Sequence, residues 1–429
     1  MKIAILTMFN GLSNTYSLVN VVEEQLKMLL SDNITVKMLV SQHCPDSDRT
    51  GIFADKRIEW VKIINSSQGK TFRWKTYTKA TDVIEEDFFD QARLISNDYI
   101  KYLEDVDICI MHDILYQGVH LLHNVAIRLA QQFLPNLKFV AFTHSAPVEH
   151  LDAPYPINCM FTGMPNTTFV YPTKCGLPYL AKQYAVDVSD CAYINNALAP
   201  TLSLSEQTKQ IVNSLDLCSK DIVIIYPARL CMSKKFHVVA EFAGYFKKYF
   251  GKSVGVVFCD FSCSDIPPNM YKHLITDYAY LGGLEKDELT FTSNLGFTNG
   301  VSRQTVLELF TLSNLFICPS YSESFGLTVL EASSRANFLV LNQAVPALYE
   351  LGLSLNAYFM RWSAKNYGFD TIETYHPSQK SYYIENAQKI LNAMQDNDVL
   401  RAKTLTRLRY SDKRIYLDQL KPLLISLTK

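Results

Sequence analysis

The sequence of 429 residues lacks several features that would place it in a specialised class of protein. Its ten cysteines are scattered singly and include no CxxC pair; the closest two are Cys259 and Cys263. A zinc site and a disulfide framework are therefore not expected, and the pattern favours a reducing, cytoplasmic compartment. The formal net charge is −1, so no field of the whole protein attracts nucleic acid or anionic lipid.

Long apolar runs are also missing. No run approaches the ~20 residues that a membrane-spanning helix needs. The N-terminal run at 3–6 is soon followed by Asn10-Gly11, which does not resemble a signal peptide. We expect a cytoplasmic protein without a transmembrane segment, for which peripheral membrane contact remains an alternative.

What is present is typical of a well-packed globular protein, because 48% of the residues are hydrophobic and 19% are charged. Short apolar runs alternate with longer amphipathic stretches, which predicts an α/β protein with parallel sheets. The expected strands are 2–8, 34–40, 106–111, 138–143, 168–171, 191–194, 221–226, 254–259, 277–281 and 315–318. The expected helices are 15–31, 83–103, 117–133, 176–185, 236–249, 302–312, 326–335, 345–350 and 382–396.

The length suits two domains of ~200 residues each, joined by a linker at 195–205. We expect two Rossmann-like, doubly wound domains at 1–197 and 198–410, followed by a C-terminal helix at 411–429 for which the N-terminal domain is a candidate packing surface. Ligands of such sheets bind outside the carboxyl ends of the strands, so two facing domains would form a cleft.

The most informative segment is 319–332, where a short apolar strand is followed by a turn and a helix. A helix N-terminus near Gly326 offers unpaired N–H groups to a phosphate, and glycine permits close approach of a ligand. Glu323 precedes this helix and Glu331 lies within it. A carboxylate beside the inward face of a helix needs a partner, and ribose hydroxyl groups would be suitable.

A second motif follows the expected strand 221–226. Arg229 and Lys234 lie five positions apart on a loop between a strand and a helix. A planar guanidinium and a compact ammonium suit the two phosphates of a diphosphate. Fixed cations would also stabilise the negative charge that grows on a leaving diphosphate.

Together these segments resemble the donor-binding signatures of retaining, nucleotide-sugar-dependent glycosyltransferases of the two-domain GT-B type (glycosyltransferase group 1, family 4-like). The Glu-x7-Glu pattern is complete, whereas Ala228 and Lys235 replace the glycines of the family's Gly-Arg-Leu-x3-Lys-Gly motif. The family's glycine-rich turn after strand 254–259 is absent here. The resemblance implies donor binding by Arg229, Lys234, Glu323, Ser324, Phe325, Gly326, Leu327 and Glu331.

The resemblance also implies roles in the N-terminal half. His144 follows the strand 138–143, where the family has a histidine near the transferred sugar, and it joins Glu323, Arg229 and Lys234 as a predicted catalytic residue. His112 and Asp113 end another strand. With Asn10 and Gly11 of the first strand–helix turn, they are predicted cleft or acceptor residues. Each of these residues also has a purely structural interpretation.

The expected activity is transfer of a hexose from a nucleoside diphosphate sugar, most naturally a UDP-sugar, with retention of the anomeric configuration. No cofactor or metal is expected, since the cations and the helix would hold the diphosphate. Asp105-Val106-Asp107 matches the letters of an Asp-x-Asp metal motif but precedes a strand. The expected partners are the nucleotide sugar and a glycan or cell-envelope acceptor.

Three kinds of alternative stay open. The basic and aromatic stretch 70–79, if extended, would place Arg73, Lys75, Tyr77 and Lys79 on one face, which suits DNA. Phage enzymes that glucosylate DNA bases share this two-domain design, so DNA is a possible acceptor. A catalytically silent nucleotide-sugar-binding protein is the alternative without an activity. A glycoside hydrolase, which has no use for the two cations, and a nucleotide-sugar epimerase on the same architecture are the enzymatic alternatives.

Overall fold

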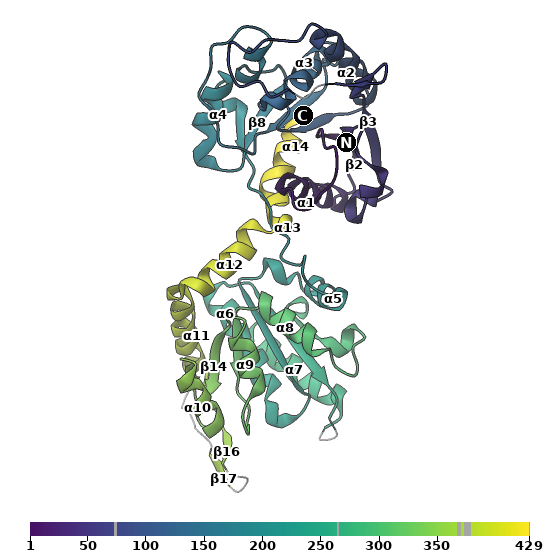
Figure 1. Cartoon of the computed structure of the whole chain (residues 1–429). Coiled ribbons are helices and arrows are strands. Elements are labelled where there is room, and N and C mark those ends of the chain that lie inside the picture. Colours follow the sequence, from purple (N-terminus) through teal and green to yellow (C-terminus); the bar gives the residue numbers. More distant parts are fainter. Residues whose placement is uncertain (73–74, 264–265, 367–369, 373–378, 429) are drawn as a thin grey trace. The chain divides into compact units, whose positions relative to one another are not determined.

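The computed structural model describes residues 1–72, 75–263, 266–366, 370–372 and 379–428. The chain divides into two compact units (Figure 1). Unit 1 comprises Met1–Leu198 and Asp412–Lys429, and unit 2 comprises Ala199–Ser411. No helix in the described part of the chain is long and apolar enough to cross a membrane.

Unit 1 is built on a seven-stranded parallel sheet with the order β3-β2-β1-β6-β7-β8-β9. Its inner strands are continuous apolar runs because both faces of the sheet are covered. The strands are β1 (Lys2–Leu6), β2 (Thr35–Ser41), β3 (Ile58–Ile63), β6 (Ile108–His112), β7 (Lys138–Phe142), β8 (Thr167–Tyr171) and β9 (Cys191–Tyr193). A short antiparallel pair, β4 (Ser66–Ser67) and β5 (Lys70–Thr71), stands apart from it.

Alternation along β1 shows how both faces of this sheet are buried. Ile3 and Ile5 pack in one apolar cluster with α1 (Ser17–Ser31), while Ala4 and Leu6 pack in another with the helices of the opposite face. Those helices are α2 (Phe88–Leu103), α3 (Leu121–Gln131) and α4 (Leu177–Tyr184). Unit 1 is therefore a doubly wound sheet, as the sequence predicts.

The C-terminal segment belongs to unit 1 and lies on the face that carries α1 (Figure 1, yellow). It consists of α13 (Asp412–Ile415), a π-helical turn (Tyr416–Leu420) and α14 (Lys421–Leu427). The Tyr416 hydroxyl donates to Oδ2 of Asp32 at 2.6 Å, and Nζ of Lys421 lies 2.8 Å from the same oxygen. This segment thus completes the α1 face of the sheet.

Unit 2 contains a six-stranded parallel sheet with the order β12-β11-β10-β13-β14-β15. The strands are β10 (Ile222–Arg229), β11 (Val254–Phe261), β12 (Leu289–Phe291), β13 (Leu315–Cys318), β14 (Phe338–Asn342) and β15 (Tyr358–Met360). The helices are α5 (Glu206–Ser214), α6 (Phe236–Phe250), α7 (Pro268–Gly282), α8 (Arg303–Leu312), α9 (Leu327–Ser333), α10 (Pro346–Ser354), α11 (Gln379–Asp396) and α12 (Asp398–Tyr410). A small antiparallel pair, β16 (Ala364–Asn366) and β17 (Asp370–Ile372), stands apart.

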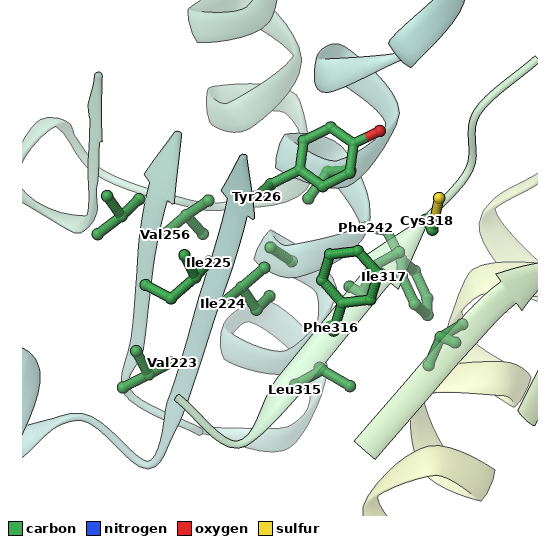
Figure 2. Close-up of a cluster of buried hydrophobic side chains, with 14 of the residues drawn as sticks. Val223, Ile224, Ile225, Tyr226, Phe242, Val256, Leu315, Phe316, Ile317 and Cys318 are labelled. Atoms are coloured by element: carbon green, nitrogen blue, oxygen red, sulfur yellow. The ribbon is translucent and has the colours of Figure 1, made fainter. Parts of the chain in front are cut away.

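The centre of unit 2 is the contact between β10 and β13 (Figure 2). Residues 222–226 of β10 and all of β13 are buried side chains, almost all of them apolar, among them Ile224 and Phe316. Phe242 of α6 belongs to the same apolar cluster. This packing fixes the carboxyl ends of β10 and β13 beside each other.

The structure corrects one predicted element and adds several. Residues 277–281, predicted as a strand, form the last turns of α7. The run is rich in aromatic residues, which favours a strand locally, but its buried positions Tyr271, Ile275 and Ala279 recur every four residues, as in a helix. Strands β3, β12, β14 and β15 lie where the sequence predicts no element.

Candidate functional site

The order of strands in unit 2 reverses between β10 and β13, because the chain continues from β10 to β11 on one side and later returns to β13 on the other. Such a switch point is where open α/β sheets bind ligands, outside the carboxyl ends of the strands. Arg229 is the last residue of β10, and Lys234 ends a short 3₁₀ turn after it. Glu323 follows β13. The topology therefore places all three residues at one edge of the sheet.

The structure brings Lys234 and Glu323 into direct contact, since Nζ of Lys234 donates to Oε1 of Glu323 in an ion pair. The two side chains are only 18% and 17% exposed. The N–H of Tyr321 donates to the carbonyl of Ser233 at 2.7 Å, and the Tyr226 hydroxyl donates to the carbonyl of Lys234 at 2.7 Å. These bonds lock the two loops together.

Arg229 lies at the same edge but is exposed. Among the described residues, none forms a hydrogen bond or ion pair with its side chain. Its five N–H donors are thus available to a ligand, and a guanidinium offers them in a planar fork that matches phosphate oxygens.

Gly326 precedes α9 with a φ of 93°, a left-handed conformation that favours glycine. A Cβ at this position would lie 3.2 Å from side-chain atoms of Leu348 and Val329. Ser324, Phe325 and Leu327 around it are exposed. Helix α9 has seven residues, so its dipole is short and the charges of the two cations dominate.

Glu331 of α9 has a partner that the sequence does not reveal. Its Oε1 accepts a hydrogen bond from Nε of Arg303 at 2.8 Å. The Glu331 side chain is 10% exposed, whereas that of Arg303 is 69% exposed. Arg303 begins α8 and stands in no recognisable motif, so only the three-dimensional structure identifies this pair.

Unit 1 has its own switch point, between β1 and β6. His112 ends β6, and His144 follows β7 by two residues. Nδ1 of His112 lies 2.9 Å from Nε2 of His144. The N–H of His144 donates to Oδ1 of Asp113 at 2.9 Å, and Nε2 of Gln117 donates to Oδ2 at 2.9 Å. The predicted residues His112, Asp113 and His144 therefore form one connected group.

Burial sets the protonation of this group. Desolvation lowers the pKa of His144 to about 4, and desolvation with the nearby His144 ring lowers the pKa of His112 well below its ordinary value. Desolvation raises the pKa of Asp113 to about 6, against the opposing hydrogen bond from the His144 N–H. Both imidazoles are therefore neutral near pH 7.

Asn10 and Gly11 line a pocket of about 260 Å³ in unit 1, which His112 also lines. Oδ2 of Asp48 supports the loop from behind by accepting the N–H of Leu12 at 3.0 Å. The sequence does not mark the other polar residues that line this pocket, which are Thr7, Tyr16, Gln117 and His120.

The basic and aromatic stretch 70–79 does not form the predicted face. Tyr77 is 5% exposed and belongs to the core of unit 1, and Phe72 is 4% exposed. Nζ of Lys75 donates to the carbonyl of Val83 at 2.8 Å. Arg73 and Trp74, which the prediction also used, lie outside the described residues.

No metal site is evident in the described part of the chain. The described residues contain no cluster of three or more histidine, cysteine, aspartate or glutamate side chains suited to a metal ion. Asp105 of the Asp-x-Asp sequence is instead paired with Nζ of Lys37 at 2.9 Å and with Lys2. These ion pairs lower the pKa of Asp105 to about 2.

Comparisons with solved structures give matches along the whole chain at low similarity. A glycosyltransferase from Rickettsia africae is 16% identical, with 100% of this chain and 98% of that chain covered and a TM-score of 0.36. The Anabaena protein HepE in complex with UDP is 12% identical, with coverage of 99% and 100% and a TM-score of 0.36. Sucrose-phosphate synthase from Thermosynechococcus elongatus is 14% identical, with coverage of 99% and 98% and a TM-score of 0.37.

A search of curated protein sequences finds no significant match. In contrast, residues 207–348 match the family model described as "Glycosyl transferases group 1". That range includes β10 with Arg229, the turn with Lys234, and the segment from Glu323 to Glu331. The second unit thus carries a group 1 glycosyltransferase domain, in the half of the chain that holds both donor-binding motifs.

Proposed function

We propose that the protein transfers a hexose from a nucleoside diphosphate sugar, with a UDP-sugar as the preferred donor, and that the anomeric configuration is retained. The observation that carries this proposal is the pair of cations at the unit 2 switch point. Arg229 ends β10 without a partner among the described residues, and Lys234 lies five positions further along the same loop. A diphosphate carries the charge and the oxygen geometry that such a pair binds.

Glu323 would contact hydroxyl groups of the transferred sugar. Its ion pair with Lys234 holds the carboxylate beside the cation that we assign to the diphosphate. The sugar and the diphosphate are adjacent parts of the donor, so the side chains that bind them must also be adjacent. Glu331 would accept hydrogen bonds from the ribose, in place of or together with that from Arg303.

In the proposed reaction, the oxygen of an acceptor hydroxyl forms a bond to the anomeric carbon while the bond from that carbon to the diphosphate oxygen breaks. The electron pair of the broken bond stays on the leaving diphosphate, and an oxygen of this group takes the proton of the acceptor hydroxyl. The products are the glycosylated acceptor and a nucleoside diphosphate. Attack and departure on the same face of the sugar retain the configuration.

Arg229 and Lys234 contribute most when the leaving group gains negative charge, and they thereby lower the barrier rather than only tighten binding. A single removed donor of this kind typically costs a factor of ~10² to 10³ in rate. In unit 1, His144 would contact the transferred sugar. Its imidazole is neutral near pH 7 because its pKa is about 4, which suits hydrogen bonding to a hydroxyl rather than charge pairing.

We also propose that unit 1 binds the acceptor and unit 2 the donor, and that the enzyme works in the cytoplasm. The ten cysteines are scattered singly along the sequence, a pattern typical of a reducing compartment. The acceptor is a glycan or a component of the cell envelope, with a DNA base as the alternative. The loss of the predicted basic face at 70–79 removes the feature that favoured DNA.

The test is a panel of UDP-, GDP- and ADP-sugars with the purified full-length chain, read by thermal shift and by release of the nucleoside diphosphate. Stabilisation and slow hydrolysis by one nucleotide class are expected. A protein that is stabilised but releases no nucleotide with any acceptor is a silent binder. If no donor stabilises the protein, the transferase proposal is wrong.

A further inference from the structure

The pocket at the unit 1 switch point has an unusual polar feature. Nε2 of His112 is buried and has no hydrogen-bond partner among the described residues. His112 as a whole residue is 1% exposed. A buried polar atom without a partner costs free energy, so a ligand that supplies the missing hydrogen bond recovers that cost.

The two ring nitrogens of His112 differ in their surroundings. Nδ1 of His112 is engaged with His144, which follows β7. Strand β6 lies between β7 and β1 in the sheet, so His112 stands between His144 and the residues that follow β1. The residues that follow β1, including Asn10 and Gly11, line the pocket together with His112.

The charge of the lining distinguishes between classes of ligand. None of the described residues that line the pocket is a lysine, arginine, aspartate or glutamate. The two histidines of the lining are neutral near pH 7, because desolvation lowers the pKa of His120 to about 4 and that of His112 well below its ordinary value. No positive charge from the lining therefore compensates a phosphate.

Two acidic groups lie behind the lining. Oδ2 of Asp48 supports the loop and lies 3.2 Å from the position of a Cβ on Gly11. Asp113 holds the amide of Gln117, which is one of the lining residues. Carboxylates at these positions repel an anion and leave a neutral hydroxyl group unaffected.

We infer that this pocket takes a neutral, hydroxyl-bearing sugar of the acceptor, and that Nε2 of His112 forms a hydrogen bond with one of its hydroxyl groups. The inference rests on the proposed function, since it names the class of the acceptor. A volume of about 260 Å³ is at the small end of ligand pockets and suits one sugar ring rather than a nucleotide. The side-chain amide of Asn10 and the hydroxyl of Tyr16 supply further polar contacts around such a ring.

The experiment measures sugar binding to the full-length chain by ligand-observed NMR in the absence of nucleotide. Glucose, galactose, mannose and N-acetylglucosamine are each compared with their own 6-phosphates, which keep the ring and add charge. At least one neutral sugar should bind, and its 6-phosphate should bind about tenfold more weakly or not at all. A duplex DNA oligonucleotide and a free phosphate buffer serve as the anionic alternatives and should not compete.

Two variants of one residue test the role of Nε2. In His112→Asn, the shorter amide keeps a polar group near the position of Nδ1, toward His144, but does not reach the pocket. In His112→Gln, the longer amide places a polar group near the position of Nε2. The sugar should bind about tenfold more weakly to the asparagine variant than to the glutamine variant. His43→Asn, at an exposed position of unit 1, is the matched control and should bind as the unchanged protein does.

The outcomes separate this inference from the proposed function. If nucleotide sugars stabilise the protein but only phosphorylated sugars or DNA bind unit 1, the transferase proposal stands and the neutral-acceptor inference is overturned. Equal sugar affinity of the two His112 variants, or no binding of any neutral sugar, also overturns it. Thermal unfolding of each variant shows whether a loss of binding reflects a loss of fold.

Discussion

Lys234 and Glu323 are 89 positions apart in the chain and form an ion pair at the carboxyl edge of the unit 2 sheet. They meet because β10 and β13 are neighbours in the sheet, so that the loops after these strands run side by side. Arg229 on the same edge has no such partner among the described residues. Because of this difference, we expect substitutions of Lys234 and of Arg229 to have different effects.

Lys234→Ala should lower kcat/KM for the sugar donor by about 100-fold, because it removes a positive charge from the leaving group and leaves Glu323 without its counterion. Steady-state release of nucleoside diphosphate measures the effect. Lys209→Ala is the control, since Lys209 also forms an ion pair in unit 2, with Glu206 at 2.7 Å on α5. An equal loss in both variants would show that general destabilisation, rather than donor chemistry, explains the result.

Arg229→Lys should retain part of the activity, because it keeps the charge but loses the planar fork of donors. We expect kcat/KM to fall about tenfold in the lysine variant and about 100-fold in Arg229→Ala. The melting temperature should change little in both, since the side chain is exposed. Arg401→Ala, at an exposed position of α12, should leave kcat/KM unchanged. Equal activity of the lysine variant and the unchanged protein would contradict the diphosphate assignment.

The sequence predicts most of the fold but less of the candidate site. The apolar runs of β10 and β13 predict both strands, because burial on both faces demands a continuous apolar sequence. The prediction of a strand at 277–281 is wrong. This run looks like a strand in the local sequence, but the buried residues of α7 recur with the spacing of a helix. Edge strands such as β3 alternate in burial and present only a weak apolar signal.

At the site, the sequence predicts which residues stand in the loops but not how they pair. The motifs identify Lys234, Glu323 and Glu331, whereas Arg303 stands outside any motif and approaches Glu331 only through the packing of α8 and α9. The link between His112 and His144 likewise depends on the order of β6 and β7 in the sheet. A contact between residues far apart in sequence follows from topology, and local pattern does not encode it.

If the carboxylate of Glu331 contacts the ribose, Glu331→Ala should weaken binding of a ribonucleotide donor by about tenfold. Binding of the corresponding 2′-deoxyribonucleotide donor should be weakened by a smaller factor. Competition of UDP and of dUDP with the sugar donor provides the measurement. Arg303→Ala removes the other partner of Glu331 and should change the two inhibition constants equally. Equal weakening of UDP and dUDP by Glu331→Ala would instead assign the carboxylate to the 3′-hydroxyl or to the support of α8.

At neutral pH, unit 1 should be less stable with Asp113 than with asparagine at the same position. Its pKa is raised to about 6 by burial, so the folded protein binds more protons than the unfolded chain between pH ~4 and ~6. The free energy of unfolding that depends on Asp113 therefore falls as the pH rises through this window, and the cost is complete above it. Asparagine tolerates the left-handed φ of 60° at this position and can still accept the N–H of His144.

Asp113→Asn should accordingly stabilise the protein by about 1 kcal/mol near pH 7, and this advantage should vanish as the pH approaches ~4. Calorimetric melting of both proteins across this range gives the difference, in which the contributions of the buried histidines cancel. Asp82→Asn is a control of opposite sign, because backbone N–H groups of Lys79 and Thr78 lower the pKa of Asp82. That substitution should destabilise the protein near neutral pH, with the effect fading as the pH falls. A difference between Asp113→Asn and the unchanged protein that does not vary with pH would show that Asp113 is not the group that titrates.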